Sequence, residues 1–335
     1  MKTRKLGQIE VSEIGMGCMA FSHGYGAIPE REYAIEAIRN AYTHGCTFFD
    51  TAEVYGNVLY YEHHNEEILG EALHDVRKNI VIATKLHIHD DEVSQDIYDV
   101  CKRHLIASMK ALQTDYVDLY YLHRINPQVP VEKVAITMGK LIKEGLIRGW
   151  GLSQVEESII HRAHEITPVS AVQNLYNMLE RDCETNTFPY CLKNNIGVVP
   201  FSPIASGFLS GKITKDTAFE KVDDVRMFVP QLQKENIEAN QPVIDLLNTY
   251  ATLKHATNAQ ISMAWMLHKY PNVVPIPGSK NKERIIENLE ASTIELTEEE
   301  FQSLEKALNS IRIHGHRGNV QFQGQSMKDW GKENK

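Results

Sequence analysis

The chain has 335 residues and a formal net charge of −9, with 35 lysines and arginines against 44 aspartates and glutamates. The acidic balance argues against a nucleic-acid or anionic-membrane partner, and no apolar run approaches the roughly 20 residues that a membrane-spanning helix needs. Five cysteines without a CxxC pair favour free, mostly buried thiols. The basic start, residues 1–5, continues into 7–11 without an apolar segment, so we expect no signal peptide and a cytoplasmic protein.

Strand-like runs rich in β-branched and aromatic residues alternate with helical patterns along the chain. The expected strands span 13–17, 47–50, 80–85, 117–123, 148–153, 171–176, 197–202 and 272–277. The expected helices span 29–44, 65–73, 96–112, 131–144, 158–165, 182–194, 259–269 and 282–288. This alternation predicts parallel βαβ units, and eight of them match a closed (β/α)8 TIM barrel, an eight-stranded parallel fold of the α/β class.

An open doubly wound sheet is the rival fold. A dinucleotide-binding sheet of that kind often carries GxGxxG after its first strand, whereas Gly15-Met-Gly17 is only GxG. The surplus residues fit a single barrel domain over 1–335. Residues 1–11 would form an N-terminal hairpin, 205–240 a long loop after the seventh strand, and 295–310 an extra C-terminal helix. We expect the polar tail 313–335 to be mobile or to lie over the surface.

Polar side chains stand at or just after the ends of three expected strands. Asp50 closes the second strand, Lys85 the third and His123 the fourth, while Tyr55 follows Asp50 by five residues. In a barrel, the loops at the carboxyl ends of the strands build the active site, so these side chains are expected to meet there. Taken singly, each has a simpler explanation: the lysine and the aspartate as solvated loop residues and the tyrosine as packing.

A phenol, an ammonium, a carboxylate and an imidazole together can protonate an oxygen that gains negative charge. A neighbouring ammonium stabilises a phenolate, so Lys85 would make Tyr55 a better proton donor, and Asp50 would keep Lys85 charged and oriented. His123 could hydrogen-bond a carbonyl oxygen. Hydride addition to a carbonyl produces such an oxygen, and a nicotinamide is a common hydride source.

Several separated segments resemble the aldo-keto reductase family. They are 49–56 (Phe-Asp-Thr-Ala-Glu-Val-Tyr-Gly), the strand end at 84–85 and the strand end at His123, within a resemblance that runs from about residue 4 to about residue 313. The closest likeness is to bacterial soluble reductases, through segments 15–19, 122–124, 199–203 and 274–278. The resemblance implies a (β/α)8 barrel that binds NADPH without a Rossmann motif. It also implies Tyr55 as the general acid, Asp50 and Lys85 as the groups that tune it, and His123 as the group that orients the carbonyl.

The same resemblance implies the position of the cofactor. Ser153 and Gln154 would hold the nicotinamide carboxamide with help from Gln173, and Phe201 would stack on the ring. A further group matches the loop that faces the pyrophosphate: Ser202, Ile204, Gly207, Leu209, Gly211 and Lys212. The last group matches the adenosine end, with Ser279, Lys280 and Arg284 at the 2′-phosphate and Glu287 and Asn288 near the adenine. A helix start with solvated charges remains the alternative for 279–284.

The sequence departs from the family pattern in three places. Gln154 stands where the family most often has asparagine, so the carboxamide contact would shift on the longer side chain. Ser206 stands where relatives often carry a basic residue, which removes a possible phosphate partner. The segment 57–64 looks longer and more aromatic than usual and is expected to line the substrate mouth. Its two histidines and the pair at 87 and 89 suggest a metal site as an alternative, but they lack zinc-type spacing, so we expect no metal.

The sequence therefore predicts an NADPH-dependent enzyme that reduces a small aldehyde or ketone to an alcohol. The alternative is a regulatory protein, because a similar scaffold serves as potassium-channel β subunits, where the bound cofactor acts mainly as a sensor. A barrel that keeps the fold without catalysis is a third possibility, which the four polar residues oppose. No feature of the sequence specifies the substrate or an oligomeric state.

Overall fold

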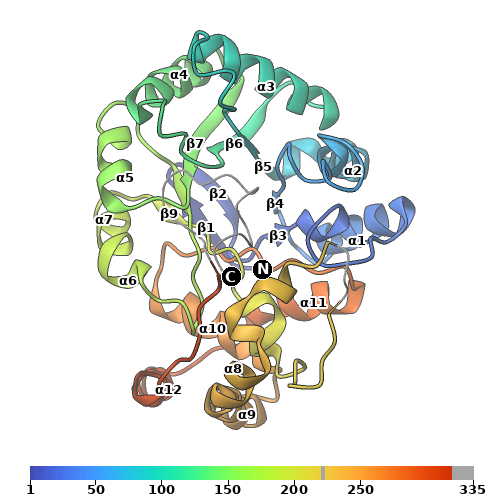
Figure 1. Cartoon of the computed structure of the whole chain (residues 1–335), viewed down its shortest axis with the longest axis vertical. Helices are drawn as coiled ribbons and strands as arrows, with labels where there is room; N and C mark the ends of the chain where they lie inside the picture. Colours follow the sequence, from blue (N-terminus) through green and yellow to red (C-terminus); the bar gives the residue numbers. More distant parts are fainter. Residues whose placement is uncertain (220–222, 319–335) are drawn as a thin grey trace.

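The computed structural model describes residues 1–219 and 223–318, in which helices surround a ring of strands (Figure 1). Within these residues, the main sheet has seven parallel strands that pair in chain order. They are β3 (Met16–Gly17), β4 (Phe48–Asp50), β5 (Val81–Leu86), β6 (Val117–Leu122), β7 (Ile147–Ser153), β8 (Ala171–Gln173) and β9 (Gly197–Val198). Strands β4, β5, β6 and β8 are buried at every residue, as expected for parallel strands covered on both faces.

The expected eighth strand, 272–277, closes the ring through single bridges rather than through a regular ladder. Val273 bridges to β9 and Gly278 bridges to β3, both in the parallel sense. Pro275 and Pro277 have no N–H, so toward the β3 segment they only accept hydrogen bonds through their carbonyl oxygens. The predicted (β/α)8 TIM barrel is therefore confirmed, with an irregular closing segment.

The helices agree with the expected alternation of strand and helix. The α-helices are α1 (Arg31–Thr43), α2 (His64–Leu73), α3 (Ile97–Ala111), α4 (Val131–Lys143), α5 (Glu157–His164), α6 (Cys183–Asn186), α7 (Phe188–Lys193), α8 (Lys234–Ala239), α9 (Gln241–Lys254), α10 (Asn258–Lys269), α11 (Lys282–Glu290) and α12 (Glu298–Ser310). The 3₁₀ turns are η1 (Met19–Phe21), η2 (His74–Asn79), η3 (Ala205–Ser210), η4 (Val225–Phe228), η5 (Pro230–Leu232) and η6 (Ala291–Thr293). Side-chain caps begin four of the α-helices, α3 at Asp96, α10 at Thr257, α11 at Asn281 and α12 at Thr297.

Two expectations for the second half of the barrel were wrong. The expected helix 182–194 is two helices, because the chain departs from a single helix at Thr187, just before Pro189. The expected loop 205–240 contains η3, η4, η5 and α8, and α9, which follows it, was not expected. The buried stripe of α9, from Val243 to Ala251, does have helical spacing.

The N-terminal hairpin of β1 (Thr3–Leu6) and β2 (Ile9–Ser12) pairs antiparallel, as the sequence analysis expected. Leu6 and Ile9 belong to the same buried cluster as barrel-interior residues such as Leu119. Gly197 allows Leu6 to pack against the barrel interior, because a Cβ at position 197 would lie 2.3 Å from Leu6 Cδ2. The hairpin therefore contributes apolar side chains to the inner core of the barrel.

The first residues of the expected tail are held against the barrel. His314 exchanges hydrogen bonds with Asn240, and the Arg317 amide donates to the Glu180 carboxylate at 2.5 Å. Residues 313–318 thus lie over the surface, and the rest of the predicted tail, 319–335, lies outside the described residues. No helix in 1–219 or 223–318 combines the length and the apolar character that crossing a membrane would require.

Candidate active site

Lys85 contacts both Asp50 and Tyr55 at the carboxyl ends of β4 and β5. The Lys85 ammonium donates to Asp50 Oδ1 at 2.5 Å, to the Thr51 carbonyl oxygen at 2.6 Å and to the Tyr55 hydroxyl at 3.3 Å. Gln173, at the end of β8, donates from Nε2 to the second Asp50 oxygen at 2.8 Å. All three donor positions of the ammonium are thereby used, which fixes Lys85 beneath the phenol.

Burial and charge act in opposite directions on this group. Burial by itself would lower the pKa of Lys85, but the charges and hydrogen bonds of Asp50 and Tyr55 outweigh it and raise that pKa. Burial raises the pKa of the Tyr55 phenol, and the Lys85 charge opposes only part of the rise. At neutral pH Lys85 is therefore charged and Tyr55 keeps its proton.

His123 completes the group at the end of β6. Its ring meets the Tyr55 ring edge to face, with centroids 5.8 Å apart and planes at 81°. Burial, followed by the charges of Arg124 and Lys85, lowers the pKa of His123 well below its usual value. The imidazole is therefore neutral at physiological pH and has one N–H that it can donate to an oxygen.

The segment between Asp50 and Tyr55 is attached to the barrel by a buried network around Glu53. The Glu53 carboxylate accepts from the His87 amide at 2.5 Å and pairs with His104 Nδ1 at 2.8 Å, and His104 Nε2 meets Glu92 at 3.0 Å. Burial alone would lower the pKa of His104, but the two carboxylates outweigh it and raise that pKa to about 9. A charged His104 therefore ties the Tyr55 segment to α3.

A cavity of about 690 Å³ opens over this group. The predicted site residues that line it are Asp50, Tyr55, His123, Ser153, Gln173, Phe201, Ser202, Ile204, Gly207, Lys212, Ser279, Lys280, Arg284, Glu287 and Asn288. Four predicted residues are not part of its lining. Lys85 lies beneath Tyr55, Leu209 belongs to the hydrophobic core, and Gly211 ends η3. Gln154 Oε1 accepts a hydrogen bond from the Leu175 amide at 2.9 Å.

One wall of the cavity is a loop in an uncommon backbone conformation. Ser202, Ala205 and Ser206 have φ of 51°, 49° and 55°, and Gly207 has φ of 99°. Residues in the left-handed region can turn consecutive amides toward one point, which suits an anion. The Ser206 hydroxyl is buried and has no hydrogen-bond partner among the described residues. This loop has turned amides and a buried hydroxyl of the kind that can hold a phosphate, and it lies in the cavity wall.

The opposite wall is the start of α11, preceded by Ser279 and Lys280. Asn281 caps the helix by accepting from the Arg284 amide at 2.8 Å. The Lys280 ammonium donates to the carbonyl oxygens of Tyr25, at 2.8 Å, and Ala27, at 2.5 Å. Lys280 thus connects the end of the barrel to the loop after β3, a contact that the sequence analysis did not predict.

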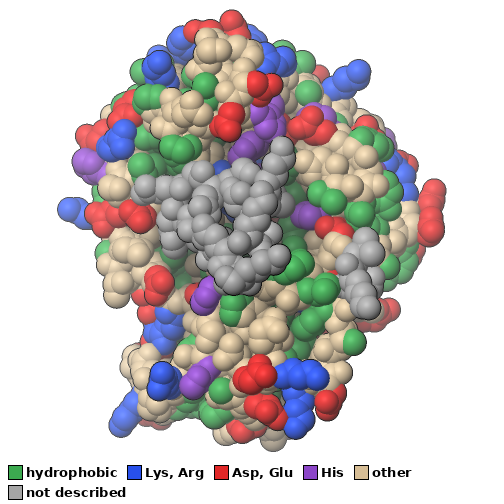
Figure 2. Space-filling view, viewed as in Figure 1, with side chains coloured by type: hydrophobic (Ala, Val, Ile, Leu, Met, Phe, Trp, Pro, Cys, Tyr) green, Lys and Arg blue, Asp and Glu red, His purple; other side chains and the backbone are tan. Residues whose placement is uncertain are grey.

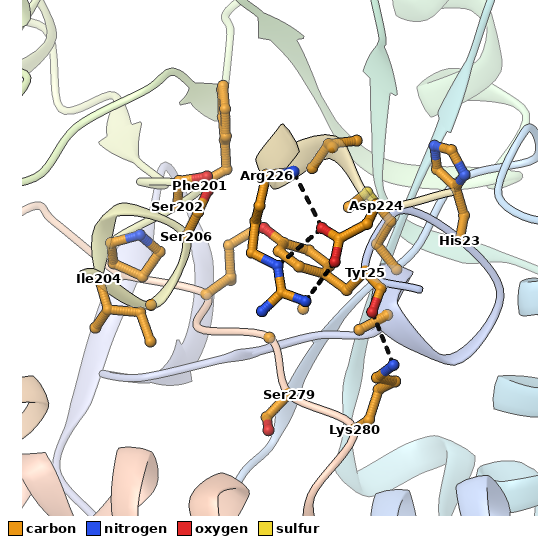
Figure 3. Close-up of a pocket in the computed structure, with 18 of the residues that line it drawn as sticks. His23, Tyr25, Phe201, Ser202, Ile204, Ser206, Asp224, Arg226, Ser279 and Lys280 are labelled. Carbon is orange, nitrogen blue, oxygen red and sulfur yellow. Dashed lines mark hydrogen bonds and ion pairs between the residues drawn. The ribbon is translucent and has the colours of Figure 1, made fainter. Parts of the chain in front are cut away.

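A segment from Asp223 to Phe228 crosses the cavity and pairs with the loop after β3. Asp224 forms an antiparallel bridge with Tyr25, and Asp223 pairs with His23 at 2.8 Å. Figure 3 shows Arg226 against the Asp224 carboxylate, which it contacts through two nitrogens at 2.8 and 2.5 Å. We call residues 223–228 the strap. The sequence offered one signal for it, the length of the loop after the seventh strand.

The segment after Tyr55 reaches the cavity only at its beginning. Asn57 and Val58 line the cavity, whereas Tyr60 and Tyr61 are exposed beyond it. Figure 2 shows hydrophobic side chains to the right of the centre of the face that Figure 1 also views. His64, the last residue of the segment, bonds the Ser22 hydroxyl at 2.9 Å.

Arg124 is a site residue that the sequence analysis did not assign. It follows His123 directly and lines the cavity, and its Nη1 donates to the His123 carbonyl oxygen at 2.5 Å and to Ser153 Oγ at 3.0 Å. The available signal was its place beside His123 at a strand end. Its guanidinium adds a second cation, after Lys85, to the group of polar side chains at this end of the barrel.

The amino-acid sequence matches the model of the aldo/keto reductase family over residues 13–309. It is 33% identical over 313 residues to a protein from Glycine max described as probable aldo-keto reductase 1, a match that covers 92% of this chain and 88% of that protein.

The fold is similar to solved structures of the same kind. A glycerol dehydrogenase from Gluconobacter oxydans matches with a TM-score of 0.81 and 25% identity, covering 97% of this chain and 98% of that one. An aldo-keto reductase from Klebsiella pneumoniae in complex with NADPH matches with a TM-score of 0.71 and 26% identity, covering 91% and 95%. Plant and bacterial proteins both appear among these relatives, so the bacterial branch stays a prediction.

Proposed function

Since the chain belongs to the aldo/keto reductase family, we propose that it reduces an aldehyde or ketone to an alcohol with NADPH, and that Tyr55 donates the proton. The carbonyl compound, NADPH and one proton give the alcohol and NADP⁺. The observation that carries the proposal is the contact of the Tyr55 hydroxyl with the Lys85 ammonium at the floor of the cavity.

Each side chain has a separate role at the carbonyl group of the substrate. Tyr55 and His123 face one cavity from neighbouring positions, so both can hydrogen-bond the carbonyl oxygen and polarise it. As negative charge develops on that oxygen, the Tyr55 hydroxyl transfers its proton, and Lys85 stabilises the phenolate that remains. Asp50 keeps the ammonium in place and balances its charge.

The cavity has groups suited to each part of NADPH, which would supply the hydride when bound. Phe201 and Ser153 line the cavity together with Tyr55, and the nicotinamide would lie against them. The left-handed loop that includes Ser206 suits the pyrophosphate, because it combines turned amides with an unpartnered buried hydroxyl. The start of α11 with Arg284 suits the 2′-phosphate, since helix amides and a guanidinium both favour negative charge.

The regulatory alternative receives no support from the relatives named above, which are described as reductases and a dehydrogenase. Small-molecule carbonyl compounds therefore remain the expected partners.

A panel of aldehydes, ketones and quinones tests the proposal, with the loss of NADPH absorbance as the readout. We expect turnover of at least one class, with an alcohol formed for each NADPH consumed. NADPH binding without turnover of any carbonyl compound would contradict the enzymatic proposal and would favour the sensor.

A further inference from the structure

We propose that Arg124 is an anion-recognition residue and that the preferred substrates are 2-oxo acids with an apolar substituent. The inference rests on the proposed function, because it concerns the substrate of the same site. It starts from the position of the guanidinium, which lines the cavity together with Tyr55 and His123.

Arg124 has hydrogen-bonding capacity to spare. One nitrogen, Nη1, makes both of its hydrogen bonds, to the His123 carbonyl oxygen and to Ser153 Oγ. Among the described residues, no carboxylate forms an ion pair with it, and no other hydrogen bond engages Nε or Nη2. Nε and Nη2 have no such partner among these residues, yet they are not buried polar atoms, so solvent can reach them. The unused side of the guanidinium is therefore accessible from the cavity, in a form that matches the two oxygens of a carboxylate.

The charges of the side chains around Tyr55 also favour an anionic substrate. Asp50 and Lys85 neutralise each other across 2.5 Å, and His123 and Tyr55 are uncharged at neutral pH. Arg124 then leaves an excess of one positive charge beside the carbonyl position. The reduced nicotinamide ring is itself uncharged, so an anionic substrate would complete the balance and a neutral one would not.

The place of Arg124 in the chain limits where the anion can be. It follows directly the histidine that we expect to hydrogen-bond the carbonyl oxygen, and its side chain extends from β6 toward Ser153 at the end of β7. A carboxylate bonded to the carbonyl carbon lies closest to such a group. A 2-oxo acid can therefore keep its ketone oxygen on Tyr55 and His123 while its carboxylate meets Arg124.

The apolar substituent follows from the outer wall of the cavity. Val58 and Phe228 line it and are 62% and 58% exposed, and Met19 and Met227 line it with them. Exposed apolar side chains at a cavity mouth gain free energy when an apolar group covers them. Both acids of the strap have partners: Asp224 pairs with Arg226, and Asp223 accepts from the Gly24 amide at 2.7 Å and contacts His23 at 2.8 Å.

A matched pair of compounds tests the inference: phenylglyoxylate and its uncharged methyl ester. The enzyme is assayed with NADPH as wild type, Arg124→Met, Arg124→Lys and Arg124→Gln. Because the ester is intrinsically the more electrophilic, the informative quantity is the change in the acid-to-ester ratio of kcat/KM. Arg162→Met is the matched control, since Arg162 pairs with Glu132 on the outside of the barrel.

We expect Arg124→Met and Arg124→Gln to lower the ratio about 10- to 150-fold, the range for hydrogen bonds to charged groups. Arg124→Lys should retain part of the preference, and Arg162→Met should retain all of it. In the wild type, rising salt should raise KM for the acid more than for the ester. This salt test needs no variant, so it holds even where a substitution impairs folding.

An unchanged ratio, with equal losses for acid and ester, would overturn the inference and leave Arg124 as a positioning residue for Ser153 and His123. Wild-type turnover of the ester without the acid would overturn it as well. Failure on every carbonyl compound would instead contradict the proposed function itself.

Discussion

Replacement of Lys85 by methionine tests the buried ion pair on which the proposed proton donor depends. The variant keeps the length and apolar stem of the side chain but removes the charge that meets Asp50 at 2.5 Å. Asp50 is 2% exposed, so its carboxylate would be left buried with only the Gln173 amide as a strong donor. Removing one partner of a buried pair typically costs about 3–5 kcal/mol, and because Asp50 lines the cavity we expect the lower end, about 3 kcal/mol.

The assay is urea unfolding at pH 7 of the wild type, Lys85→Met and the double variant Asp50→Asn/Lys85→Met. The double variant removes the orphaned charge, and its amide oxygen can still accept from Gln173. We expect it to be at least about 1.5 kcal/mol more stable than the single variant. Equal free energies of unfolding for the two variants would refute the reasoning, because the cost would then not come from an unpaired carboxylate.

The pH dependence of that difference has a definite sign. Burial raises the pKa of Asp50, and Lys85 opposes the rise, so without Lys85 the folded-state pKa lies further above the unfolded value of about 3.9. The folded single variant then binds a proton more tightly than its unfolded chain. Its stability relative to the double variant should therefore improve as the pH falls toward about 4 and worsen as the pH rises.

The other predictions concern the cofactor, the mouth and the buried histidine. Arg284→Ala should weaken NADPH binding by about 1.5–3 kcal/mol, measured by fluorescence titration, and barely change NADH binding; equal losses would make Arg284 structural. Shortening 57–61 should change substrate preference more than the NADPH dissociation constant, and a chelator should leave activity unchanged; loss restored by zinc would contradict this. The raised pKa of His104 predicts stability that is complete below about pH 6.5 and falls by about 1–2 kcal/mol as the pH rises through about 9. His104→Gln should remove that slope, and a persistent slope would assign it to another group.

The barrel and the proximity of Asp50, Lys85 and His123 could be predicted from the sequence because both depend on short-range signals. Runs of buried residues mark parallel strands, and a barrel brings the residues that follow them to one end. Asp50, Lys85 and His123 could therefore be placed together without any long-range contact being known. The hydrogen bond between Lys85 and Asp50 follows from that topology, since an ammonium buried beside a carboxylate must pair with it.

Contacts between segments that are distant in the sequence could not be predicted from such short-range patterns. The strap meets the loop after β3 across almost 200 positions, through the Tyr25–Asp224 bridge and the Gly24–Asp223 hydrogen bond (separation 199). No periodic pattern marks such a pairing. The tie from Lys280 to the Tyr25 carbonyl oxygen is of the same kind, because any backbone carbonyl can accept from an ammonium.

The interruption of the eighth strand shows a different limit. Hydrophobicity marks 272–277 as a strand, whereas a ladder also needs N–H donors, and Pro275 and Pro277 supply none. The missed helix α9 is an error of another sort, because its buried stripe was readable in the sequence.

The most direct test of the account is the turnover of Tyr55→Phe. The variant keeps the ring that meets His123 edge to face and removes only the hydroxyl that contacts Lys85. For any carbonyl compound that the wild type reduces, we predict that kcat falls about 10²- to 10⁴-fold while the NADPH dissociation constant stays within about two-fold. A kcat within about three-fold of the wild type would contradict the account, since another group would then deliver the proton.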